Sequence, residues 1–157
     1  MKILFFHGFE STLPSSKADW MAQQGHTVLA HPMGYDKDNA FYKALECAKE
    51  FNPNLIVGSS MGGYFAFLTG THLPTKLVLL NPALQSRSKE YKHPENGKYL
   101  PETWALLGKN DTLIDPVVTA EKLKKLNAKV TIGEHAHRTP LDVFSAYMES
   151  NVFNQLC

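Results

Sequence analysis

The sequence has almost no excess charge, few cysteines and no long apolar run. Its formal net charge is +1 and no cluster of lysines and arginines stands out, which argues against a nucleic-acid-binding protein. No apolar stretch approaches the ~20 residues of a membrane span, and the short apolar N-terminus runs directly into His7-Gly8, unlike a signal peptide. Cys47 and Cys157 give no disulfide framework, so we expect a cytoplasmic protein.

The composition is that of a folded globule. Of 157 residues, 43% are hydrophobic and 20% are charged, which predicts a single domain over residues 1–157 with its own core. We find no internal repeat, low-complexity tract or long linker. The sequence therefore predicts one domain without an internal boundary.

Strand and helix patterns alternate along the chain. Short apolar runs predict strands at residues 2–6, 27–30, 55–57, 76–80, 104–107 and 129–132. Helices are predicted from amphipathic or capped segments at 15–24, 36–51, 115–126 and 141–153, and from an apolar segment at 61–72. Apolar strands joined by helices indicate an α/β fold with about six mainly parallel strands and helices on both faces of the sheet. In such sheets, ligands bind at the carboxyl ends of the strands.

Residues 81–101 interrupt this alternation. The stretch contains three prolines and several charges and shows no helical or strand period. It leaves the sheet at the expected ligand-binding edge. We expect either a small cap over the site, at residues 84–101, or a surface excursion.

The motif Gly58-Ser59-Ser60-Met61-Gly62 lies between a predicted strand and a predicted apolar helix. This is the context of a nucleophile elbow, in which a strained serine projects its hydroxyl above the sheet. A dinucleotide-binding loop would need glycine at Ser60, and a P-loop would need a Gly-Lys-Ser/Thr ending. The sequence thus predicts Ser60 as a nucleophile, with the backbone N–H of Met61 as one oxyanion donor.

A serine nucleophile needs a base and an acid that orients the base. Asp111 follows a strand, whereas Asp115 precedes Pro116 and has the position of a helix cap, so we expect Asp111 to be the acid. His135 and His137 both follow the last strand. His135 is nearer to the strand end, and we expect it to be the base. A metal pair of His135 and His137 would lack a third ligand at an obvious spacing.

The second oxyanion donor is expected in the loop after the first strand, because that loop flanks the elbow. Gly8 permits a close approach, and the N–H of Phe9 would point at the substrate carbonyl. His7 is expected to brace this loop by hydrogen bonding.

Five segments together resemble the YqiA-type small esterases of the α/β-hydrolase superfamily. They are FHGFEST (6–12), IVGSSMGGYFA (56–66), LNPA (80–83), NDTLID (110–115) and GEHAH (133–137). The resemblance implies a compact α/β-hydrolase fold and a serine esterase acting on short-chain acyl esters, with Ser60, Asp111 and His135 as its triad. His137 departs from the family pattern, which has an aromatic residue there.

The resulting expectation is an acyl transfer through an acyl-Ser60 intermediate, without cofactor or metal. The partner would be a small-molecule acyl ester or thioester, and neither nucleic acid nor membrane is expected. Two alternatives stay open: a transacylase, in which a bound alcohol replaces water, and a catalytically silent ligand-binding protein on the same scaffold.

Overall fold

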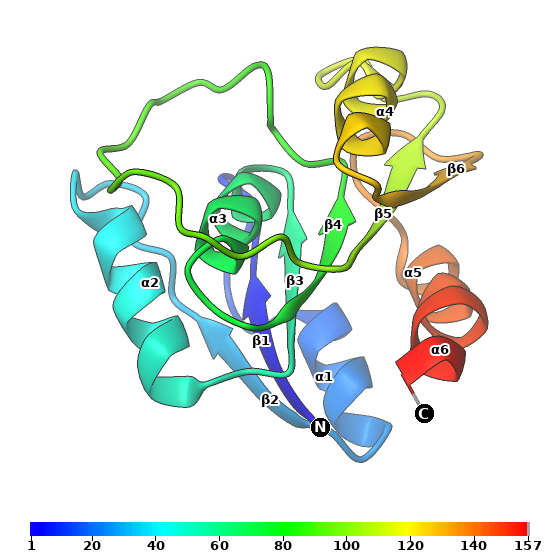
Figure 1. Cartoon of the computed structure of the whole chain (residues 1–157). Helices are drawn as coiled ribbons and strands as arrows, with labels where there is room; N and C mark the ends of the chain where they lie inside the picture. Colours follow the sequence, from blue (N-terminus) through cyan, green and yellow to red (C-terminus); the bar gives the residue numbers. More distant parts are fainter. Residues whose placement is uncertain (157) are drawn as a thin grey trace.

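The fold is built on one six-stranded parallel sheet (Figure 1). The structure is a computed structural model that describes residues 1–156, and Cys157 lies outside the described residues. The strand order is β2-β1-β3-β4-β5-β6, and all five strand pairs are parallel. The strands are β1 (Lys2–Phe6), β2 (Thr27–His31), β3 (Leu55–Ser59), β4 (Lys76–Leu80), β5 (Thr103–Gly108) and β6 (Lys129–Gly133).

The four central strands are buried on both faces, as their continuous apolar runs predict. All residues of β5 and the last four of β1 are buried, whereas the edge strands β2 and β6 are largely half-buried or exposed. The chain changes direction across the sheet between β1 and β3, where Phe6 pairs with Gly58. Crevices at such switch points are the usual ligand sites of open α/β sheets.

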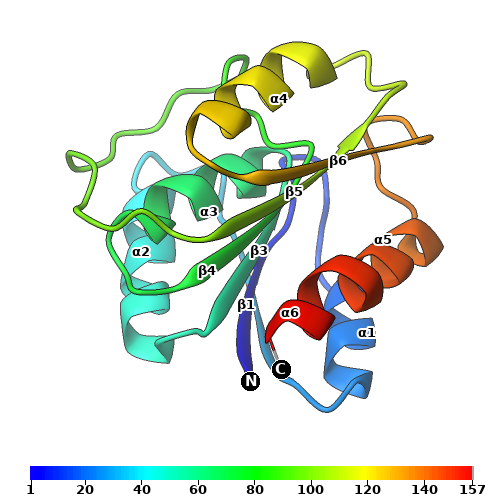
Figure 2. The same cartoon turned by 45° about the vertical axis from the view of Figure 1, so that its right-hand side comes forward.

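Helices cover both faces of the sheet (Figure 2). One face carries α1 (Ser16–Gln23), α5 (Leu141–Tyr147) and, continuing from α5, the π-helical stretch η1 (Met148–Phe153) and α6 (Asn154–Leu156). The other face carries α2 (Ala40–Phe51), α3 (Met61–Gly70) and α4 (Pro116–Lys125). The predicted α/β architecture is therefore confirmed. None of the helices formed by residues 1–156 has the length and apolar character that crossing a lipid bilayer requires.

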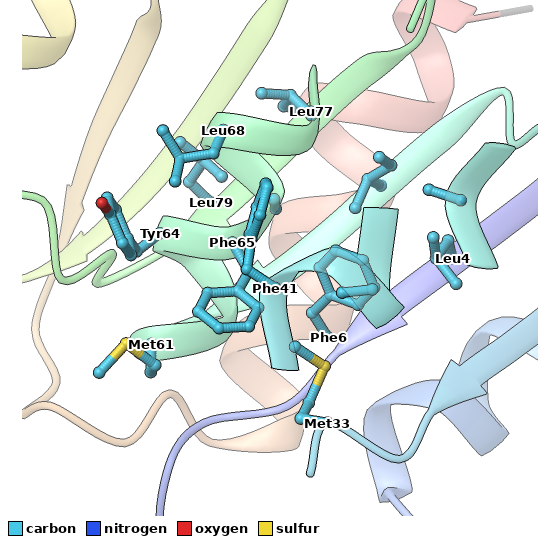
Figure 3. Close-up of a cluster of buried hydrophobic side chains, with 14 of the residues drawn as sticks. Leu4, Phe6, Met33, Phe41, Met61, Tyr64, Phe65, Leu68, Leu77 and Leu79 are labelled. Carbon is cyan, nitrogen blue, oxygen red and sulfur yellow. The ribbon is translucent and has the colours of Figure 1, made fainter. Parts of the chain in front are cut away.

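The larger of two core clusters lies between the sheet and the helices α2, α3 and α4. Figure 3 shows Phe41 of α2 and Phe65 of α3 meeting over the sheet residues Phe6 and Leu79. The Phe41 and Phe65 rings pack edge to face with centroids 5.4 Å apart. Burying each such ring contributes about 2 kcal/mol or more, so this layer fixes α3 firmly against the sheet.

The connection from β4 to β5 has no helix. Residues 81–102 form neither helix nor strand, and Figure 1 shows the segment passing outside α3 on its way to the start of β5. Aromatic contacts hold it in place, with the buried Tyr91 ring 5.1 Å from that of Phe65. Residues 86–88 line a pocket beside Ser60. The predicted cap role of residues 84–101 stays a prediction.

Helix α2 starts later than its sequence pattern suggests. The predicted start was residue 36, but residues 36–39 form turns and the helix begins at Ala40. The Lys37 N–H donates to the Gly34 carbonyl, which closes a turn before the helix. The charged residues of this turn continue the polar pattern of the helix, which is why the sequence predicts an earlier start.

Candidate active site

Ser60 occupies a strained turn between β3 and α3. Its φ and ψ are 55° and −115°, a conformation that side-chain-bearing residues rarely adopt. A Cβ on Gly58 would overlap the carbonyl of Gly62, and a Cβ on Gly62 would overlap the carbonyls of Phe6 and His7. The two glycines are thus required by space, because α3 begins directly against the end of β1 and β3.

A continuous hydrogen-bonded chain joins Ser60, His137 and Asp111. Ser60 Oγ lies 2.9 Å from His137 Nε2, and His137 Nδ1 lies 2.7 Å from Asp111 Oδ2. An ionised carboxylate only accepts hydrogen bonds, so the ring proton sits on Nδ1. Nε2 is then free to accept from the serine hydroxyl, the arrangement in which imidazole can take up that proton.

Asp111 is held rigidly at the exit of β5. Its side chain is fully buried, and Oδ1 accepts the N–H groups of Leu113 and Ile114 at 2.8 and 2.9 Å. These two bonds leave Oδ2 directed at His137. Asp115 instead accepts the N–H groups at the start of α4 as the N-cap. Asp115 is therefore the helix cap that the sequence predicts, and Asp111 lies against His137, where its role as the acid stays a prediction.

The predicted contact between His135 and Ser60 is wrong, because His137 takes that place. His135 is buried over the ends of β5 and β6, and its Nδ1 pairs with the Ala136 carbonyl at 2.8 Å. A Cβ on Gly108 would lie only 2.8 Å from that nitrogen. β6 is three strands away from β3, a lateral distance of about 14 Å, so the loop must continue beyond residue 135 before a side chain reaches the serine. Sequence proximity to the strand end was therefore the wrong criterion.

Asn81, at the exit of β4, connects the loops that carry the acid and the histidine. Its Oδ1 accepts the Gly108 N–H at 2.6 Å, and its Nδ2 donates to the His137 carbonyl at 2.7 Å. Asn81 is buried and has a positive φ of 42°. Sequence reasoning gave it no role, although an asparagine that ends a buried strand within the LNPA motif was a usable signal.

The loop after β1 lies against the elbow. A Cβ on Gly8 would be 3.5 Å from Ser60 Cβ, so the backbone at residues 8–9 borders the serine. His7 is buried, and its Nδ1 donates to the Gly8 carbonyl at 2.8 Å, which braces the loop as expected. Met61 is the first residue of α3, where N–H groups have no partner within the helix. Its N–H and that of Phe9 are the predicted oxyanion donors.

A pocket of about 320 Å³ opens above Ser60. The loop after β1 forms one wall, residues 86–88 form a second, and Leu113 and Ile114 form a third. Both Ser60 and His137 are exposed to it. Within residues 1–156, no three His, Cys, Asp or Glu side chains are grouped so that they could hold a metal ion.

Solved structures with the α/β-hydrolase fold superpose over nearly the whole chain. A member of the α/β hydrolase superfamily from Xanthomonas campestris pv. campestris has a TM-score of 0.77 at 20% identity, with 99% of each chain covered. Est1E from Butyrivibrio proteoclasticus has a TM-score of 0.74 at 14% identity, covering 99% of this chain and 88% of its own. The esterase domain of a Rhodothermus marinus protein has a TM-score of 0.66 at 15% identity, covering 94% and 82%. At these identities the likeness establishes the α/β-hydrolase fold.

None of the curated proteins matches this sequence. A sequence family, however, matches residues 2–93, which include the loop after β1 and the elbow. The match covers more than half of the chain, and it agrees with the resemblance read from the motifs. The chain belongs to the uncharacterised protein family UPF0227 and has the α/β-hydrolase fold.

Proposed function

We propose that this protein is a serine esterase that cleaves short-chain acyl esters or thioesters through an acyl-Ser60 intermediate. The observation that carries the proposal is the hydrogen-bonded chain from Ser60 through His137 to the buried Asp111. The strained backbone of Ser60 supports it, since strain of this kind persists where function requires it. The names of the structural neighbours, among them an esterase domain, agree with this reaction class.

Acylation begins with proton transfer from Ser60 to His137. Ser60 Oγ attacks the substrate carbonyl while His137 Nε2 accepts the hydroxyl proton, and the imidazolium that forms is stabilised by Asp111 at 2.7 Å. The same proton then passes from His137 to the leaving alcohol or thiol, as the carbon–oxygen or carbon–sulfur bond breaks. The acyl group remains as an ester on Ser60.

The tetrahedral intermediate carries a negative charge on the former carbonyl oxygen. The N–H groups of Phe9 and Met61 are the proposed donors to this oxygen, because one belongs to the loop against the elbow and the other to the first turn of α3. The positive end of the α3 dipole adds to the same stabilisation. One such donor is typically responsible for about 10²–10³-fold in rate.

Water completes the cycle. His137 takes a proton from a water molecule, the resulting hydroxide attacks the acyl-enzyme, and the carboxylic acid leaves as the proton returns to Ser60. Every proton and bond is accounted for by the three side chains and water, so the mechanism needs no cofactor. The pocket of about 320 Å³ favours a small acyl group.

The proposal is tested with p-nitrophenyl butyrate and a fluorophosphonate probe. Wild-type protein should hydrolyse the ester and be labelled, whereas Ser60→Ala and His137→Ala should lose roughly 10⁴–10⁶-fold in kcat and all labelling. His26→Ala is the matched control, since His26 lies at the opposite edge of the sheet beside Met1. Folded wild-type protein that neither turns over the ester nor takes up the probe would favour a silent ligand-binding protein. Transfer of the butyryl group to an added alcohol at the expense of hydrolysis would identify a transacylase.

A further inference from the structure

A second pocket lies on the other side of the loop that follows β1. It has a volume of about 550 Å³ and is bordered by the start of α1 and the start of α5. It shares Gly8, Glu10, Ser11, Ser59 and Arg138 with the pocket above Ser60. The two pockets therefore meet at the residue before the nucleophile and the residue after the proposed base.

The walls of this second pocket carry two positive charges, from Lys17 and Arg138. In the part of the chain that the structure describes, neither side chain has a carboxylate within 4.0 Å. Burial and the nearby charge of Arg138 lower the pKa of the Lys17 ammonium below its usual value. Two cations that repel each other across a concave surface are stabilised by a bound anion.

Neutral polar residues line the pocket together with the two cations. The hydroxyls of Ser11, Thr12, Ser15 and Ser16 line the same pocket. Ser15 precedes α1 without making a side-chain capping bond, so the first N–H groups of this helix have no side-chain partner there. The positive end of the helix dipole thus lies at the pocket wall beside Lys17.

One carboxylate, that of Glu10, also lines the pocket. Glu10 is exposed and pairs with neither Lys17 nor Arg138 among the described residues. Asp19 lies in the first turn of α1 but does not line the pocket. A single solvated carboxylate leaves the net charge of the wall positive.

We propose that Lys17 and Arg138 form a subsite for an anionic group of the substrate, a carboxylate or a phosphate carried on the acyl or the alcohol part. This inference rests on the proposed function, because the subsite adjoins the reaction centre of an esterase. Ser59 and Arg138 are sequence neighbours of Ser60 and His137, so an ester bound above Ser60 extends into the subsite with a short chain. The natural substrate is then a small charged ester rather than a neutral lipid.

The test compares pairs of substrates in which one member carries an anionic group that the other lacks. In the first pair, p-nitrophenyl hexanoate is compared with the mono-p-nitrophenyl ester of glutaric acid, which carries the charge on the acyl part. In the second pair, 1-butyrylglycerol is compared with 1-butyrylglycerol 3-phosphate, which carries it on the alcohol. For at least one pair, wild-type protein should have a kcat/KM about 10–100 times higher for the anionic substrate than for the neutral one. This is the range that charge-assisted hydrogen bonds provide.

Variants of the pocket residues test whether the preference for the anionic substrate depends on Lys17 and Arg138. Lys17→Gln and Arg138→Gln should each lower the anionic-to-neutral kcat/KM ratio about 10-fold. Glu10→Gln should raise it, because Glu10 is the one carboxylate that residues 1–156 place on the pocket wall. Lys122→Gln on the exposed side of α4 is the control and should leave it unchanged. Equal ratios for wild type and Lys17→Gln, with neutral esters still cleaved in a Ser60-dependent way, would overturn the subsite and leave the esterase intact. If folded wild-type protein cleaves none of these esters and is not labelled by the fluorophosphonate, the proposed function itself is overturned.

Discussion

Replacing Asn81 by alanine should lower the proposed activity, although the hydrogen bonds of its side chain go to His137, Thr139 and Gly108 and not to Ser60. The side chain holds the Gly108 N–H at 2.6 Å on one side and the His137 carbonyl at 2.7 Å on the other. Gly108 ends β5 just before the loop of Asp111, so one amide group fixes the spacing of the acid loop and the histidine loop. Asn81→Ala removes both bonds at once.

The size of the effect follows from these two bonds. Leaving the buried Gly108 N–H without an acceptor costs about 1–3 kcal/mol, and losing the bond to the partly buried His137 carbonyl costs about 0.5–1.5 kcal/mol. The free energy of unfolding should therefore fall by about 1.5–4.5 kcal/mol. A shift of His137 by about 1 Å would lower kcat by about 10²-fold, with a smaller change in KM.

The assay must separate positioning from stability. Steady-state kinetics on p-nitrophenyl butyrate and the rate of fluorophosphonate labelling are measured well below the unfolding transition, for Asn81→Ala and Asn81→Asp. Aspartate keeps the acceptor for Gly108 but loses the donor to His137, so its kcat should also fall. Leu123→Ala is the control. Truncating this buried side chain should cost a similar ~2–5 kcal/mol, and Leu123 lies near the end of α4 opposite to Asp115. If Asn81→Ala is destabilised yet keeps the wild-type kcat and labelling rate, the positioning argument is refuted.

Three further predictions concern the elbow, the proposed triad and His135. Asp111→Asn should keep its backbone hydrogen bonds but favour the wrong tautomer of His137, lowering kcat by roughly 10²–10⁴-fold; an unchanged kcat would contradict the assignment. His135→Ala should lower the melting temperature but keep fluorophosphonate labelling, because the His135 ring is buried over the strand ends. Loss of labelling in folded His135→Ala protein would instead indicate that His135 is the base. Gly62→Ala should lower the free energy of unfolding in urea by about 1–3 kcal/mol or more, since the added methyl overlaps the Phe6 carbonyl; equal midpoints would contradict this.

The fold was readable from the sequence because its signals are local. A strand buried on both faces is a short apolar run, and each of the six runs became a strand of the parallel sheet. The choice of Asp111 over Asp115 was equally local, since Asp115 carries the signature of a helix cap next to Pro116. Such signals reflect backbone geometry over a few residues, and the same few residues determine that geometry.

The choice of histidine and the conformation of residues 84–101 could not be predicted from the sequence, because both depend on parts of the chain that are distant in sequence. Choosing between His135 and His137 requires the strand order, which sets how far the loop after β6 must travel to reach β3. Residues 84–101 show no periodic pattern because they are held by single aromatic contacts, such as that of Tyr91 with Phe65, rather than by a repeating apolar face. Neither kind of information is present in a short window of sequence.

The three residues of the proposed triad are widely separated along the chain, so the proposed activity would report complete folding. Ser60 follows the third strand, Asp111 the fifth and His137 the last, so a nascent or truncated chain that stops before the sixth strand holds a nucleophile without a base. Under the proposed mechanism, a partly assembled sheet is hydrolytically inert. Under the same mechanism, ester cleavage would begin only when the loop after the sixth strand has brought His137 to Ser60.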